Sequence, residues 1–154
     1  MKQVVSVFVM AALAGPVIAA RANELQPQGF TNADLNSGYA CNLSGTLGGS
    51  QVVGVAQFRP QGDGTFSAAA LRLHVSRVGV CLYALKPGTG TYDIGANGTG
   101  LAQATYSRQP KSASDCPAAF PIHLAFATSD TTCDIATLDP GVFLGGTCKK
   151  QTNQ

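Results

Sequence analysis

Apolar and polar residues alternate along much of this chain, as they do in strands that bury one face and expose the other. The pattern is clearest in residues 90–101, where Tyr92 and Ile94 are separated by polar residues of the opposite phase. Asn97-Gly98 follows, and both residue types accept a positive φ in a tight turn. The stretch therefore predicts a β-hairpin. Two strands cannot bury an apolar face alone, so the hairpin requires partner strands.

Further stretches with the same period lie on both sides of the hairpin and are separated by turns rich in Gly, Pro and Asp. No stretch has a helical period with capping residues. The apolar parity changes within residues 65–78, which predicts a β-bulge near 69–71. The irregular stretch 108–119 predicts a surface loop held near Cys116. The predicted strands are 39–44, 51–59, 65–78, 81–86, 91–94, 101–107, 122–128, 132–138 and 142–148.

Roughly eight or nine short strands joined mainly by tight turns indicate an all-β protein. We predict an antiparallel meander closed into a small barrel, with a β-sandwich as the alternative fold. Closure would also remove the open, apolar strand edges that invite aggregation of a neutral protein. In a closed meander the first and last strands are neighbours, which places Cys41 within reach of Cys148.

The N-terminal residues have the composition of an export signal. Lys2 precedes an apolar run, and Ala20-Arg21-Ala22 has the small-x-small pattern of a cleavage site. We predict a signal peptide over residues 1–22, a polar leader over 23–37 and one barrel domain over 38–154. The mature protein is therefore expected to be secreted or periplasmic, without a membrane span after signal removal.

The five cysteines are widely spaced and lie in the predicted mature part, which favours disulfides over metal ligation. We predict a Cys41–Cys148 disulfide. The odd number leaves one cysteine over, and a buried free thiol is the expectation because cysteine packs as a small hydrophobe. The pairing of the others stays open, and these are Cys81, Cys116 and Cys133.

The charge of the chain argues against nucleic acid as a partner. The chain has 10 Lys+Arg and 8 Asp+Glu, and loss of Lys2 and Arg21 with the signal peptide would leave eight of each. A neutral protein with scattered basic residues lacks the electrostatic footprint of a nucleic-acid-binding protein.

The arrangement of the turn glycines resembles that of a known group of proteins. The chain resembles uncharacterised exported bacterial proteins with a small lipocalin-like β-barrel, which implies architecture but no activity. Cys41 to Gly45 is also similar to the first strand of avidin-like barrels. Avidins and lipocalins both rely on tryptophans, and this chain has none, so neither ligand site can be transferred. The matching residues are Gly38-Tyr39, Asp63-Gly64, Gly90-Thr91-Tyr92, Asn97-Gly98-Thr99-Gly100, Gly145 and Lys149-Lys150-Gln151.

Candidate chemistry is sparse. His74 and His123 occupy polar-phase positions in strands, where a solvent-facing ring is favoured over a base or a metal ligand. No serine lies in a nucleophile motif. We therefore predict a protein that is not an enzyme and needs no cofactor or metal. The acidic residues explained by turn chemistry are Asp63, Asp93, Asp130 and Asp139.

Tyr92 and Tyr106 are the candidates for ligand binding. They either line a cavity in the barrel or pack in the core with a hydroxyl at its rim, and the second arrangement is favoured. Three functions follow in order of preference. The first is a non-catalytic interaction module of unknown protein partner, the second a carrier of a small apolar ligand inside the barrel, and the third a hydrolase.

Overall fold

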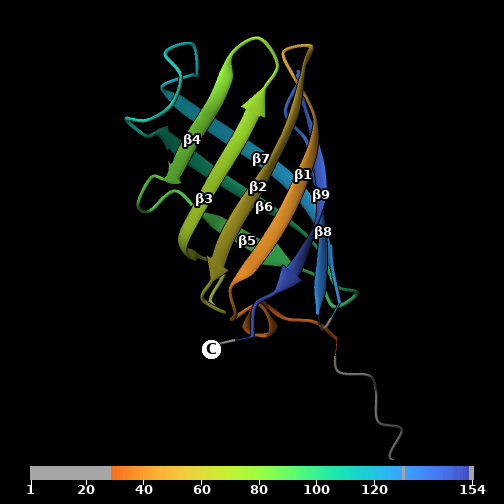
Figure 1. Ribbon diagram of the computed structural model, residues 1–154. Coiled ribbons are helices and arrows are strands. Elements are labelled where there is room, and N and C mark those ends of the chain that lie inside the picture. Colours follow the sequence, from red (N-terminus) through yellow and green to blue (C-terminus); the bar gives the residue numbers. More distant parts are fainter. Residues whose placement is uncertain (1–28, 130, 153–154) are drawn as a thin grey trace, which may run out of the picture.

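The computed structural model describes residues 29–129 and 131–152, so the predicted signal peptide lies outside the described residues (Figure 1). Within them the chain forms nine strands and one short 3-10 helix, which confirms the all-β prediction. The elements are η1 (Asn32–Asp34), β1 (Tyr39–Leu47), β2 (Ser50–Pro60), β3 (Phe66–Val75), β4 (Gly79–Leu85), β5 (Thr91–Ile94), β6 (Thr99–Arg108), β7 (Ala119–Thr128), β8 (Thr132–Thr137) and β9 (Val142–Lys150).

The strands form one antiparallel sheet in the order β4-β3-β2-β1-β9-β8-β7-β6-β5, and a further pairing of β4 with β6 closes it. The result is the predicted closed barrel of eight strands, with β5 as an additional strand. β4 and β5 follow one another along the same edge of β6. Tyr106–Arg108 of β6 pair with β4, whereas Gly100–Gln103 pair with β5.

The hairpin at residues 90–101 is present, with its first strand in β5 and its return strand in β6. Tyr92 and Ile94 are buried in the alternating pattern that the sequence predicts. Of Asn97 and Gly98, only Gly98 has a positive φ, at 80°. Asn97 acts through its side chain, whose Oδ1 accepts a hydrogen bond from the Thr99 backbone N–H at 3.1 Å.

The β-bulge predicted near residues 69–71 lies elsewhere, so its predicted position is wrong. From Ala69 to Val75 every second residue is buried without a break, and the parity changes before Ala69, because Phe66 also faces inward. The register shifts earlier, where β2 passes from Arg59 to Pro60. Proline has no N–H to donate to a ladder, so a bulge beside Pro60 costs the sheet little.

The two ends of the barrel are packed differently. The upper end in Figure 1, where β3 turns into β4, is filled by side chains that are at most 2% exposed, including Val52, Leu73 and Cys81. The lower end, beneath which η1 and the C-terminal residues lie, holds a row of aromatic rings in contact. This row consists of Tyr39, Phe58, Phe66 and Tyr92, with centroid separations of 5.1, 5.8 and 5.0 Å.

Beyond its short pairing with β6, the edge of β4 is covered by the loop over residues 109–118. The Gln109 and Ala113 backbone N–H groups donate to β4 carbonyls at 2.8 and 2.9 Å. A Cys81–Cys116 disulfide ties the loop to the strand, as expected for a loop held near Cys116. The loop thus satisfies backbone groups that an open strand edge would expose.

The predicted Cys41–Cys148 disulfide is present and joins directly opposed residues of β1 and β9. Cys133 is free and buried, as predicted for the odd cysteine. The two disulfides fit an oxidising extracellular or periplasmic location, because such bonds are rare where glutathione keeps thiols reduced.

Candidate functional site

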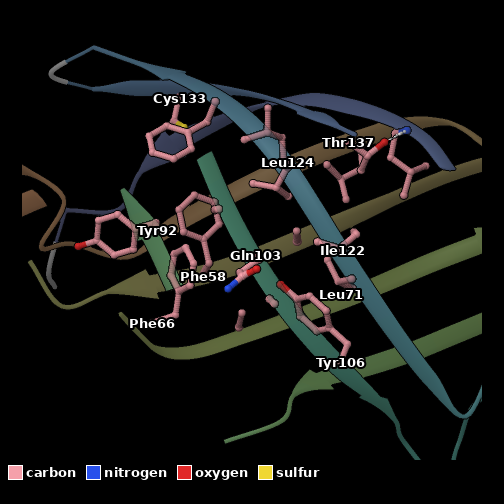
Figure 2. A pocket seen from close by; sticks show the side chains of 18 of the residues that line it. Phe58, Phe66, Leu71, Tyr92, Gln103, Tyr106, Ile122, Leu124, Cys133 and Thr137 are labelled. Carbon is pink, nitrogen blue, oxygen red and sulfur yellow. Dashed lines mark hydrogen bonds between the residues drawn. The ribbon is translucent and has the colours of Figure 1, made fainter. Parts of the chain in front are cut away.

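The barrel interior contains an apolar cavity between its two ends (Figure 2). Its volume is about 60 Å³, counted as the space open to the centre of a water-sized molecule. Every strand of the barrel except β4 contributes to the lining, and so do β5 and the segment after η1. The lining residues are Leu35, Leu43, Ala56, Phe58, Phe66, Ala69, Leu71, Tyr92, Ala102, Gln103, Ala104, Tyr106, Ile122, Leu124, Phe126, Cys133, Ile135, Thr137 and Leu144.

The cavity exists because small side chains occupy inward positions at mid-height. Ala56 of β2, Ala69 of β3 and two alanines of β6, Ala102 and Ala104, are buried in its wall. A methyl side chain reaches less far inward than Leu or Phe, so these four alanines leave space that the larger side chains do not fill.

The floor of the cavity is fixed by Tyr92. Its ring lines the cavity while its hydroxyl points away from it (Figure 2). That hydroxyl accepts a hydrogen bond from the Gly62 backbone N–H at 2.9 Å and lies 3.1 Å from the carbonyl oxygen of Leu35. Leu35 is 5% exposed and also lines the cavity. Tyr92 therefore has the arrangement favoured from the sequence, in which the ring packs and the hydroxyl reaches the rim.

Tyr106 differs from Tyr92 in the direction of its hydroxyl. The ring enters from β6 and the hydroxyl points toward the middle of the cavity (Figure 2). The side chain is 7% exposed, and its hydroxyl makes no hydrogen bond with residues 29–129 or 131–152. Burial raises the pKa of Tyr106 to about 12, so the hydroxyl keeps its proton at neutral pH.

Cys133 also lines the cavity. Burial and then the nearby Asp134 charge raise the pKa of its thiol to about 12. The thiolate is the reactive form of cysteine, so this side chain behaves as an inert apolar group at neutral pH.

Tyr83 has a second buried hydroxyl without a hydrogen-bond partner among the described residues. Its ring stacks on Phe120 in the upper end, with centroids 5.4 Å apart, and does not line the cavity. Tyr83 and Tyr106 are thus a natural pair for comparison, because neither hydroxyl has a hydrogen-bond partner among the described residues, but the Tyr83 hydroxyl is fully buried and only Tyr106 lines the cavity.

The histidines lie on the outer face of the barrel, as predicted, and neither lines the cavity. The His123 ring is 55% exposed, and its Nδ1 lies 2.7 Å from Oδ1 of Asp139. Asp139 also accepts the His123 backbone N–H at 2.6 Å. Partial burial alone would raise the pKa of Asp139, but these hydrogen bonds and the histidine charge lower it overall.

The sequence did not predict this His123–Asp139 pair, because its residues lie 16 positions apart and only the β8–β9 turn brings them together. The hydrogen bond from the His123 backbone N–H to Asp139 satisfies an edge N–H of β7 beyond the end of β8.

The other acidic residues differ in their positions. Asp63 accepts the Thr65 backbone N–H at 2.9 Å, in the turn role predicted for it. Asp93 lies within β5 rather than in a turn, and Asp130 lies outside the described residues.

In the described part of the chain, no three His, Cys, Asp or Glu side chains gather as a metal-binding group would. No helix within residues 29–129 and 131–152 is long and apolar enough to cross a membrane. Comparisons with protein-family models, curated proteins and solved structures found no match.

Proposed function

We propose that this protein is an exported, non-catalytic binding protein that holds a small apolar ligand inside its barrel. The observation that supports the proposal is the apolar cavity between two well-packed ends. Apolar space inside a protein tends to stay dry, because water gains too few hydrogen bonds there, and it accepts apolar guests such as xenon or benzene. The two disulfides suit a protein that works outside the cytoplasm.

The cavity favours a carrier over an interaction module. Large exposed apolar side chains are distributed over several elements: Val53 and Val55 on β2, Leu101 on β6, Phe143 on β9 and Leu138 after β8. Single exposed apolar residues are normal on soluble proteins and mark no partner by themselves. The interior cavity is a more specific feature than this scattered exposure.

The test is xenon uptake, followed by ¹²⁹Xe NMR and by diffraction from crystals under xenon pressure. Xenon is expected to occupy the cavity of the wild-type protein. Ala69→Leu should remove this uptake, because Ala69 is buried in the cavity wall. Ala70→Leu is the matched control, because Ala70 is the next residue of β3 and is exposed on the outer face.

Absence of xenon from the wild-type interior, or equal uptake by the two variants, would contradict the proposal. If xenon binds as expected, mass spectrometry of small molecules extracted from natively purified protein would identify what the cavity carries.

A further inference from the structure

The polar group left free inside the cavity narrows the chemistry of the ligand. We infer that the ligand is a small, uncharged molecule with one hydrogen-bond acceptor, such as a carbonyl oxygen, on an otherwise apolar frame, and that the Tyr106 hydroxyl donates to this acceptor. This inference rests on the proposed function, since it describes the occupant of the same cavity.

Tyr106 differs from the other hydroxyl-bearing side chains of the lining, because their hydroxyls already make hydrogen bonds within the protein. The Tyr92 hydroxyl is bonded to the backbone at the lower rim. The Thr137 hydroxyl donates to the Val142 carbonyl oxygen at 2.5 Å and accepts the Leu144 N–H at 2.9 Å.

Two polar side chains remain besides Tyr106. Gln103 is exposed and belongs to the outward phase of β6. Cys133 offers only a weakly donating thiol. Only Tyr106 combines burial, a strong donor and an unfilled hydrogen bond, so a guest with an acceptor would remove the cost of that unpaired group.

Charge is excluded from the ligand by the same lining. No Lys, Arg, Asp or Glu is among the residues that line the cavity. A carboxylate or ammonium group placed there would lose its hydration without gaining a counter-ion, which is far more costly than burying a neutral carbonyl with one donor.

The available space limits the size of the ligand. A single water-sized probe fills roughly 10–15 Å³. The 60 Å³ of the cavity counts only positions open to the centre of such a probe, so the cavity has room for several non-hydrogen atoms and the ligand is a small molecule. Butan-2-one and 2-methylbut-1-ene suit this space and have nearly the same shape, but only the ketone carries an acceptor.

The experiment measures the dissociation constants of both probes by NMR titration of the wild-type protein, Tyr106→Phe and Tyr83→Phe. Tyr106→Phe should weaken binding of butan-2-one about two- to ten-fold and leave binding of 2-methylbut-1-ene unchanged. Tyr83→Phe should change neither, because it also removes a buried unpaired hydroxyl but one that lies outside the cavity lining.

Equal affinity of the wild-type protein and Tyr106→Phe for butan-2-one, with xenon still bound, would overturn this inference and leave the proposed function standing. Failure of the wild-type protein to bind xenon or either probe would overturn both. The ¹³Cζ resonance of Tyr106 provides a test without substitution. It should shift on addition of the ketone more than on addition of the alkene, and equal shifts would also overturn the inference.

Discussion

Cys133 lies directly opposite Cys148 in the β8–β9 ladder, although Cys148 is bonded to Cys41 in the β1–β9 ladder on its other side. Three cysteines on three neighbouring strands thus form one row at the same level of the barrel. Cys148 occupies the middle of the row and has a cysteine on each side. Cys133 is therefore a core residue and also a second potential disulfide partner for Cys148.

The first prediction concerns this row. Cys41→Ala should produce a Cys133–Cys148 disulfide, because directly opposed residues of antiparallel strands lie within bridging distance. Mass spectrometry after alkylation of the unfolded, unreduced protein should find no free thiol in this variant and one in the wild-type protein. Two alkylated thiols in Cys41→Ala would contradict the prediction. Cys133→Ser is the control and should retain Cys41–Cys148.

The second prediction separates the packed end from the cavity. Leu73 is 0% exposed and does not line the cavity, whereas Leu71 does. Leu73→Ala and Leu71→Ala should each lower the free energy of unfolding by about 2–5 kcal/mol, measured by denaturation in guanidinium chloride. Only Leu71→Ala enlarges the existing cavity and should bind benzene more tightly than wild type. Tighter benzene binding by Leu73→Ala alone would show that the cavity has been assigned to the wrong level.

The third prediction is a loss of stability at alkaline pH. The pKa of Tyr106 is about 12 in the folded protein against 10.0 for a free side chain. Well below pH 10 the folded and the unfolded protein both keep the Tyr106 proton, so ionisation of Tyr106 costs the folded state no stability. Above pH 10 the unfolded chain ionises first, which favours unfolding by about 2 kcal/mol at pH 12. Cys133, raised from 9.0 to about 12, acts in the same direction from pH 9 upward.

Denaturant titrations at pH 8, 10 and 11 would measure this loss, with Cys133→Ala as the background to prevent disulfide exchange. Tyr106→Phe in that background should lose less stability between pH 10 and pH 11 than its parent. An equal loss in the two proteins would assign the effect to other groups.

The fourth prediction concerns the β5–β6 turn. Gly98 has a φ of 80°, and a Cβ there would lie 2.8 Å from the Thr128 carbonyl oxygen. Gly88 has a similar φ of 76° but open space around it. Gly88→Val should cost about 1–2 kcal/mol from backbone strain alone. Gly98→Val should cost clearly more, measured by thermal or denaturant unfolding.

The folded fraction of Gly98→Val should still take up xenon, because Gly98 does not line the cavity. A stably folded Gly98→Val protein that had lost this uptake would show that the turn has a function beyond folding.

The sequence predicts the strands well because nearly every strand buries one face and exposes the other. Apolar and polar residues therefore alternate along it. The hairpin at 91–108 is the clearest case, since its turn residues and its phase agree. Where alternation is weak, boundaries differ: β1 continues to Leu47 through residues 45–47, beyond the predicted end at residue 44. The bulge was misplaced because parity shows that a register shift exists, whereas the local backbone at Pro60 decides its position.

The sequence predicts that the barrel closes, but it does not predict which other strands pair to close it. A closed meander implies the β1–β9 contact and with it the Cys41–Cys148 disulfide. The pairing of β4 with β6, which leaves β5 as an additional strand, depends on how far each strand extends and has no local signal. The cavity is harder still, because it results from the summed volumes of inward side chains on many strands. Tyr106 could be placed inward by phase, but no pattern reveals that its hydroxyl lacks a partner.

The β1–β9 ladder has a consequence for how the protein is made. Its register joins Tyr39 to Lys150, so the earliest strand to be synthesised completes its pairing with the last. A nascent chain can form β1, β2 and β3 in sequence, but one edge of β1 stays open until the ribosome has delivered β9. The barrel therefore cannot close before β9 is available, and a chain truncated before residue 142 would keep an open edge on β1 that can pair with other chains.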